Sequence, residues 1–133
     1  MKRILVLFVM LSIFFAGTSL AQTTGEKNAA SDYKIVLILP GPINDQSWNA
    51  TNYAGLVACN KDLGTKMEYI ENVQSGDFES TFRNYAERGY DLIMAAGTQF
   101  DEAANKVAPS YPESTFCVVN GMIAKTDNAM PIF

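Results

Sequence analysis

Histidine is absent from this 133-residue sequence, and cysteine occurs only twice, at Cys59 and Cys117. Without histidine, the chain holds no Ser-His-Asp or Cys-His nucleophile system and no histidine-ligated metal site. Two cysteines are too few for a disulfide scaffold, although a single bridge could form after export. We expect Cys59 on a helix and Cys117 in a central strand, as two free, buried, small apolar residues.

Basic residues are also scarce. Ten Lys and Arg residues stand against 14 Asp and Glu residues, which gives a formal charge of −4, and no basic run occurs. This balance argues against a partner made of nucleic acid and against an anionic membrane surface. Loss of Lys2 and Arg3 from the N-terminus would leave eight basic and 14 acidic residues, for a formal charge of −6.

The N-terminus has the pattern of a secretory signal peptide, which we predict at residues 1–21. Two basic residues precede the apolar run 4–16, and Ser19-Leu20-Ala21 supplies the small residues of a cleavage site. The run is too short to span ~30 Å of hydrocarbon comfortably. We therefore expect an exported protein, soluble in the periplasm or outside the cell, that starts near Gln22. No cysteine near the cut could carry a lipid.

The polar residues 22–32 have no apolar period and are predicted to form a flexible leader. From residue 33 onward, short apolar runs alternate with longer segments of helical pattern. The predicted strands are 33–39, 66–73, 91–96 and 114–119. The predicted helices run from a cap at Asp45 or Ser47 to about Leu63, from Ser75-Gly76-Asp77 to Gly89, and from Gly97-Thr98 to about Val107.

This alternation predicts an α/β fold, a parallel sheet with helices on both faces and right-handed crossovers. Residues 122–133 show no full element, although a fifth strand could be starting there. We therefore expect residues 33–133 to be an incomplete α/β lobe. The apolar side of the first helix is predicted to carry Tyr53, Leu56, Val57 and Leu63. That of the second is predicted to carry Phe78, Phe82, Tyr85 and Ala86.

Polar residues gather where three predicted strands end, at 41–48, 97–100 and 120–121. Ligands of open α/β sheets bind beyond the carboxyl ends of the strands. Two of these loops also precede a helix, whose free N–H groups add donors. Together with an aromatic residue, they predict a pocket for a small molecule. Taken singly, these residues have simpler readings: Asp45 and Ser47 as helix caps, Gly97-Thr98 and Asn120 as turn residues, and Trp48 as a lid on the local core.

Motifs of several enzyme classes are missing. No G-x-G-x-x-G follows the first strand, and neither a P-loop nor a G-x-S-x-G elbow occurs. Asp101 and Glu102 are adjacent, so on a helix their carboxylates point about 100° apart and make a poor acid/base pair. We therefore expect binding rather than catalysis, and no cofactor.

Three segments carry motifs that are specific when they occur together. Residues 43–49 (INDQSWN) fit an apolar or aromatic residue followed by N-D-x-S-aromatic-N. Residues 90–100 (YDLIMAAGTQF) fit G-D-L-I with Tyr90 at the position of the first glycine, then a glycine, then a phenylalanine before an alanine-rich helix. Residues 111–116 (YPESTF) fit Y-P-x-x-x-F. Over residues 34–121 the chain resembles the basic membrane protein family of ABC transporter substrate-binding proteins.

The resemblance implies the type I periplasmic-binding-protein fold, a small polar ligand captured between two lobes, and delivery to an ABC permease. Several members of the family bind purine nucleosides, and the full-length form is expected to be a monomer. Residues carried over from the first, third and fourth loops, with Ser47 from the first loop, make up the predicted site. They are Asn44, Asp45, Ser47, Trp48, Gly97, Thr98, Gln99, Phe100 and Asn120.

Three departures from the family pattern bear on the ligand. The family often has aspartate where this chain has Asn120, so one charge-assisted bond to a ribose hydroxyl is lost. It often has phenylalanine where this chain has Ile43 or Trp48. Family members are also more than twice as long, so the chain resembles only the first lobe. A sugar or a nucleobase stays open as the ligand. A ligand sensor with a signalling partner, or less favourably a secreted α/β enzyme, stays open as the function.

Overall fold

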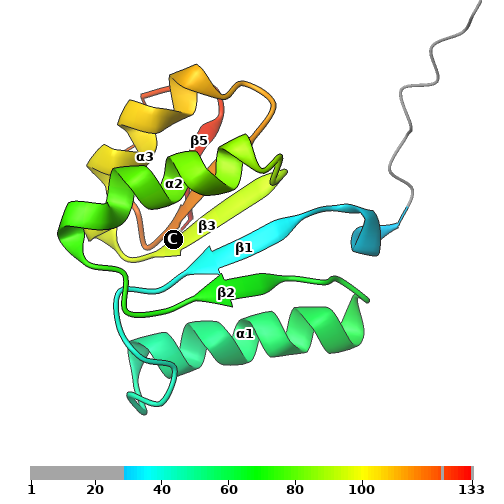
Figure 1. The fold of residues 1–133 in the computed structure, drawn as a ribbon. Helices are drawn as coiled ribbons and strands as arrows, with labels where there is room; N and C mark the ends of the chain where they lie inside the picture. Colours follow the sequence, from blue (N-terminus) through cyan, green and yellow to red (C-terminus); the bar gives the residue numbers. More distant parts are fainter. Residues whose placement is uncertain (1–28, 124, 133) are drawn as a thin grey trace, which may run out of the picture.

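Five parallel strands form the centre of the computed structural model, which describes residues 29–123 and 125–132 (Figure 1). The strands are β1 (Ile35–Ile38), β2 (Glu68–Ile70), β3 (Leu92–Ala96), β4 (Thr115–Val119) and β5 (Ala129–Ile132). Their order in the sheet is β2-β1-β3-β4-β5. The chain therefore builds outward in one direction from β1 to β2, and in the other direction from β3 to β5. The direction in which strands are added thus reverses between β1 and β3. The loops after these two strands lie next to each other at this topological switch point, which is where α/β sheets bind ligands.

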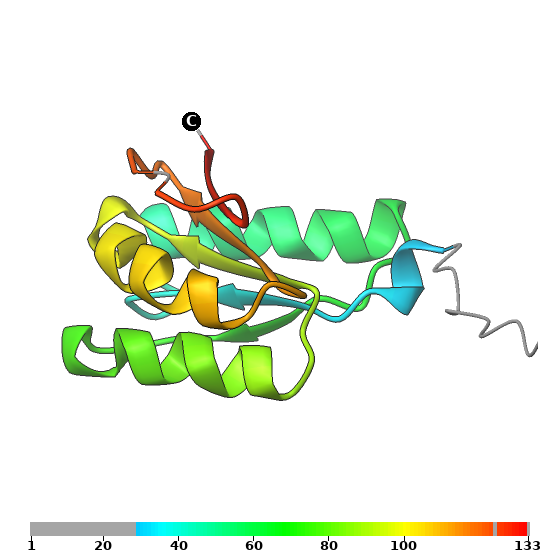
Figure 2. The ribbon, with the colours of Figure 1, turned by 90° about the horizontal axis from the view of Figure 1, so that it is seen from above.

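Helices cover both faces of the sheet, as predicted. They are α1 (Trp48–Asp62), α2 (Phe78–Glu87) and α3 (Asp101–Val107). Seen from above, α1 lies on one side of the sheet and α2 and α3 lie on the other (Figure 2). Short 3-10 turns lead into α2 at Ser75–Asp77 and into α3 at Thr98–Phe100, and another follows α3 at Ala108–Ser110.

The larger part of the core lies between the sheet and the helices α2 and α3. Phe82, Phe100 and Phe116 are fully buried there. The ring centroid of Phe82 lies 6.0 Å from that of Phe100 and 5.8 Å from that of Phe116. A smaller core under α1 contains Leu37, Leu39, Leu56 and Ala96. Strand β1 contributes side chains to both cores, which confirms that its continuous apolar run marks a strand buried on both faces.

The predicted apolar face is right for α2 and only partly right for α1. Phe78, Phe82, Tyr85 and Ala86 are all buried on α2. On α1, Leu56 is buried and Tyr53 packs against the smaller core, but Val57 and Leu63 are 46% and 65% exposed. One helical step turns the side chain by about 100°, so a helix that packs along a narrow strip buries Leu56 and leaves Val57 outside.

Strand β5 confirms that a fifth strand begins within residues 122–133 and corrects the expectation that this segment holds no full element. Ala129–Ile132 pairs in parallel with β4, and the Asn128 side-chain amide donates to the carbonyls of Ala108, Tyr111 and Ser114 just before the strand begins. Pro131 has no N–H to donate, and a proline is tolerated in an edge strand such as β5.

Several expectations concern the N-terminus and the thiols. The predicted signal peptide lies outside the described residues, whereas the end of the predicted leader forms a 3-10 turn at Ala30–Asp32. Cys59 on α1 and Cys117 in β4 are free thiols, and Cys117 is buried in the sheet as expected, whereas Cys59 is only partly buried. Burial raises the pKa of the Cys117 thiol to about 11. No helix in the described part of the chain has the length and apolarity needed to cross a bilayer.

Candidate functional site

The carboxyl ends of β1, β3 and β4 lie side by side and bring the three predicted loops together. Ala96 and Val119 are paired across β3 and β4, so Gly97 and Asn120 follow neighbouring strand ends. The Gly97 N–H donates to the Val119 carbonyl at 3.0 Å. The Trp48 indole Nε1–H donates to the Ala96 carbonyl at 3.1 Å. Trp48, Gly97 and Asn120 therefore lie along one edge of the sheet.

Trp48 is fixed by that hydrogen bond but is not buried. Its side chain is 39% exposed at the first residue of α1. Its anchor on Ala96 ties the start of α1 to the end of β3. An indole held by its N–H with part of the ring in solvent offers a flat surface for stacking.

Five polar side chains in the loops after β1, β3 and β4 are exposed and make no hydrogen bond to other described residues. They are Asn44, Ser47, Thr98, Gln99 and Asn120. All five are uncharged and offer both donors and acceptors. The edge therefore presents neutral hydrogen-bonding groups beside one aromatic ring.

Asp45 is fully occupied as the cap of α1. Its Oδ1 accepts from the N–H groups of Ser47 and Ala50, each at 2.9 Å. Its Oδ2 accepts from the N–H of Asn49 at 3.0 Å and from the Asn49 side-chain amide at 2.7 Å. A carboxylate has about four acceptor positions, and here all are used. Asp45 therefore caps α1 with both oxygens, and its contact with a ligand stays a prediction, whereas Ser47 at the cap position makes no side-chain cap bond.

These hydrogen bonds stabilise the ionised form of Asp45. Donation from the Ala50 N–H, followed by that from Ser47, lowers the pKa of Asp45 from 3.8 to about 2. A carboxyl whose pKa falls on folding stabilises the protein above its unfolded pKa, and the stabilisation is lost as pH falls through the folded pKa. The contribution of Asp45 is thus complete at neutral pH and disappears between about pH 4 and pH 2.

Asp45→Ala is expected to lower the melting temperature at neutral pH, because three N–H groups at the start of α1 lose their acceptor. The difference from the unaltered chain should shrink as pH falls from about 4 to about 2, where Asp45 itself becomes protonated. Thermal unfolding followed by circular dichroism across this range measures the effect. Ser47→Ala is the matched control and should leave the melting temperature unchanged. Equal losses in both variants, or a difference that does not vary with pH, would contradict the capping role.

Two side chains that sequence reasoning missed hold the first loop in place. The Asn49 Oδ1 accepts from the Gly41 N–H at 3.2 Å, and the Glu71 Oε2 accepts from the Ile43 N–H at 2.7 Å. The sequence offers a signal for Asn49, which closes the motif at 43–49 four residues after Asp45. It offers none for Glu71, which comes from the end of β2. Both act on the loop backbone and leave its exposed side chains free.

Phe100 does not line the edge, which corrects the expectation drawn from the family pattern. Its ring is fully buried under α2, with its centroid 4.0 Å from that of Phe78. The 3-10 turn at Thr98–Phe100 points Thr98 and Gln99 outward and turns the third residue into the core. Phe100 therefore supports the loop by packing.

Gly97 has a backbone conformation that explains why a glycine starts this loop. Its φ is 129°, a value that side-chain-bearing residues rarely adopt. The Gln99 side chain folds back over the Gly97 Cα, where a Cβ would collide with it. This close approach keeps the Gln99 amide beside Gly97 at the end of β3.

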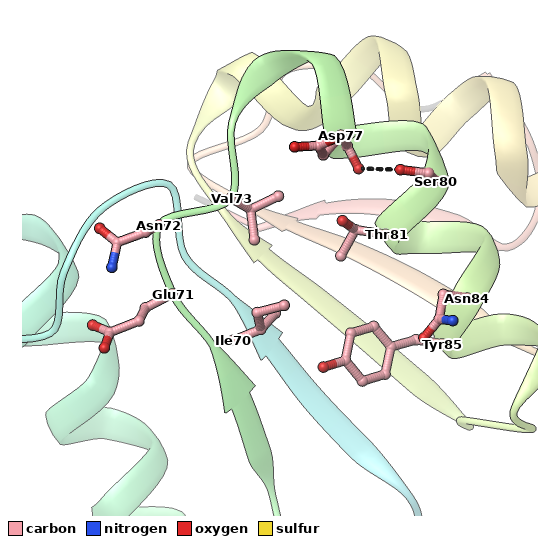
Figure 3. Close-up of a pocket in the computed structure, with 9 residues that line it drawn as sticks. All are labelled: Ile70, Glu71, Asn72, Val73, Asp77, Ser80, Thr81, Asn84 and Tyr85. Carbon is pink, nitrogen blue, oxygen red and sulfur yellow. Dashed lines mark hydrogen bonds between the residues drawn. The ribbon is translucent and has the colours of Figure 1, made fainter.

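Two hollows near the site differ from it in character. One of about 470 Å³ lies between the end of β2 and α2, and its lining includes Tyr85 and Ile70 together with polar residues such as Asn72 and Thr81 (Figure 3). It contains none of the predicted site residues. The other, of about 410 Å³, lies between α1 and β3 and is lined mainly by apolar side chains such as Leu56 and Met94. The first hollow is also lined by the acidic residues Glu71 and Asp77, and the second is mainly apolar, so neither has the uncharged polar lining found at the carboxyl edge.

Comparison with known proteins identifies the family. Residues 33–133 match the model of the Bmp family, described as ABC transporter substrate-binding protein PnrA-like. The chain belongs to this family. In the part of the chain that the structure describes, no group of three or more His, Cys, Asp or Glu side chains could hold a metal ion.

The chain is similar in sequence to part of several longer proteins. It is 28% identical over 100 residues to the transcriptional activator protein Med of Bacillus subtilis, covering 74% of this chain and 31% of Med. It is 30% identical over 105 residues to an uncharacterized lipoprotein of Pyrococcus furiosus, covering 78% of this chain and 25% of the lipoprotein. The chain thus spans about a third or less of the length of these relatives.

Solved structures share the fold. A solute-binding protein of an ABC transporter system from Aeropyrum pernix superposes with a TM-score of 0.69 at 24% identity, covering 74% of this chain and 28% of that one. A fragment of a lipoprotein from Peptoclostridium difficile superposes with a TM-score of 0.66 at 24% identity, covering 75% of this chain and 84% of the fragment. These likenesses support the α/β lobe architecture.

Proposed function

We propose that this chain is the N-terminal lobe of an exported solute-binding protein that captures a purine nucleoside for an ABC permease. The edge formed by the loops after β1, β3 and β4 is the lobe's half of the ligand site. The observation that carries the proposal is the partly exposed Trp48 ring, held on the Ala96 carbonyl at a sheet edge whose loops also carry five exposed, uncharged polar side chains.

The chemistry of this edge favours a neutral ligand with a flat ring. Asp45, the only charged residue in the predicted site, is occupied as a helix cap. A purine stacks on an aromatic side chain with about 1–3 kcal/mol per base. Ribose hydroxyls and purine nitrogens are matched by amide and hydroxyl groups such as those of Asn120, Thr98 and Asn44. A nucleotide fits less well because its phosphate finds no cation in this set and faces an acidic chain.

Capture requires no chemistry on the ligand. The loops of this lobe would hold one side of the nucleoside by stacking and hydrogen bonds, and a second lobe would close on the other side. Because a lone lobe supplies only part of these contacts, it should bind more weakly than a two-lobed protein. The permease would then receive the ligand outside the cytoplasmic membrane, where the predicted signal peptide would send the protein.

Binding of a matched panel tests the proposal. Isothermal titration of the purified chain would compare inosine, adenosine and guanosine with hypoxanthine, adenosine 5′-monophosphate and ribose. Saturable binding of the nucleosides, weaker binding of the base and the monophosphate, and no binding of ribose is the expected order. Preference for ribose or for the monophosphate would refute the nucleoside assignment, as would no nucleoside binding at millimolar concentrations.

A ligand sensor is the second candidate, and the relative named transcriptional activator protein Med favours it. In this case the same edge would bind the same class of ligand, but the occupied protein would report to a signalling partner. Deletion of the gene distinguishes the two. Loss of nucleoside uptake with unchanged gene expression supports transport. Unchanged uptake with altered expression on nucleoside addition supports sensing.

A further inference from the structure

The connection between β4 and β5 is tied to α3 by two buried polar side chains. Asp101, the first residue of α3, is 3% exposed, and its Oδ2 accepts from the Met122 N–H at 2.8 Å. Asn105, one turn later, is 6% exposed. Its Oδ1 accepts from the Lys125 N–H at 2.6 Å, and its Nδ2 donates to the Ile123 carbonyl at 3.0 Å. These bonds fix a segment, made up of residues 121–123 and Lys125, that has no regular secondary structure.

The fixed segment begins directly after Asn120 of the proposed site. Asn120 has a φ of +57°, an uncommon conformation for a residue other than glycine. Its own N–H donates to the Ile132 carbonyl at 2.6 Å, and the next N–H, of Gly121, donates to the Val118 carbonyl at 3.0 Å. The Met122 bond to Asp101 completes this turn from the side of α3. Asn120 is thus held between β5 on one side and α3 on the other.

Asp101 and Gly121 lie in close contact. A Cβ added to Gly121 would approach the Asp101 Oδ1 to 2.7 Å, so only glycine lets the turn come this near to the carboxylate. Oδ1 is buried and has no hydrogen-bond partner among the described residues. A buried oxygen without a hydrogen-bond partner lowers the stability of a fold. Stability alone therefore does not explain why an aspartate occupies this buried position. The bond that its other oxygen makes to the turn gives it a structural purpose at this place.

We propose that Asp101 and Asn105 are positioning residues of the ligand site, which lock Met122, Ile123 and Lys125 onto α3 and thereby hold Asn120 at the edge of the sheet. The turn after β4 and the Thr98-Gln99 turn before α3 then form one unit, because the same helix carries both. The role in ligand binding rests on the proposed function above. Neither residue contacts the ligand in this account; both act through the backbone that carries Asn120.

Hydrogen exchange measured by NMR on the purified chain tests the positioning without any ligand. In Asp101→Ala, the Met122 and Asn120 amides should exchange at least about tenfold faster, since one loses its acceptor and the other its fixed backbone. Asp101→Asn keeps a carbonyl acceptor for the Met122 N–H and should retain protection. Asn105→Ala should release the Lys125 amide and serves if Asp101→Ala does not fold. Amides of β1 and β3 should be unchanged in every variant.

Unchanged exchange at Met122 and Asn120 in Asp101→Ala would overturn the proposal. So would faster exchange spread equally over β1 and β3, because that pattern means global destabilisation. Inosine titration of the same variants adds the site readout. Asp101→Ala should weaken binding about fivefold to tenfold, the effect of about one well-placed hydrogen bond, and Asp101→Asn should restore it.

Equal inosine affinity in Asp101→Ala and the unaltered chain would reduce both residues to a purely structural role and overturn the proposal. If no nucleoside binds the unaltered chain, the proposed function fails. The exchange data then decide on their own whether Asp101 and Asn105 place Asn120.

Discussion

Phe100→Ala is expected to lower the free energy of unfolding by about 3–5 kcal/mol, the usual loss when a buried phenylalanine is truncated. The ring is fully buried and contacts the rings of Phe78 and Phe82. Its removal would leave a cavity between α2 and the sheet. Urea denaturation followed by circular dichroism at neutral pH measures the loss.

Gln99→Ala is the matched control, because Gln99 precedes Phe100 in the same turn and its side chain is exposed. It should leave the free energy of unfolding nearly unchanged and should weaken ligand binding instead. Phe100→Leu keeps most of the apolar volume and should recover much of the stability. If Phe100→Ala unfolds at the same urea concentration as the unaltered chain and loses only ligand binding, Phe100 lines the cleft after all.

Trp48→Ala is expected to weaken nucleoside binding roughly 5- to 150-fold, corresponding to loss of about 1–3 kcal/mol of base stacking. Because the ring is 39% exposed, its removal should cost the fold much less than that of a core aromatic. Trp48→Phe retains a stacking surface but loses the hydrogen bond to Ala96. Its affinity for inosine should therefore lie between that of Trp48→Ala and that of the unaltered chain. Isothermal titration with inosine gives the three dissociation constants.

Val57→Ala is the control on the same helix, since Val57 is exposed and lies outside the predicted site. It should bind inosine as the unaltered chain does. Equal affinity of Trp48→Ala and the unaltered chain would remove Trp48 from the site. An equal loss in Val57→Ala would show that the effect comes from α1 as a whole.

Most of the fold could be predicted from residue patterns. The apolar run at 33–39 and the spacing of Phe78, Phe82, Tyr85 and Ala86 correctly indicate a buried strand and an amphipathic helix. Such patterns indicate how a single element packs. The buried side of α1 is therefore harder to predict from its sequence. Its sequence contains apolar residues on several sides, and only packing on the sheet decides that Leu56 is buried and Val57 is not.

The site was only partly predictable because a residue type does not reveal which way its side chain points. Asp45 and Trp48 stand three positions apart in one motif, yet one caps the helix and the other lies over the end of β3. Phe100 shares a turn with Gln99 but faces the core. Glu71, Asp101 and Asn105 act on loops distant in sequence, so no local pattern marks them.

The most direct test of the nucleoside site is titration of the purified chain with inosine while the emission of Trp48, the chain's only tryptophan, is followed. Because the purine stacks on the indole, we expect a saturable change in emission whose dissociation constant agrees with that from calorimetry. Ribose should leave the emission unchanged. Inosine binding by calorimetry with no change in Trp48 emission would place the ligand away from the carboxyl edge of the sheet and contradict the account.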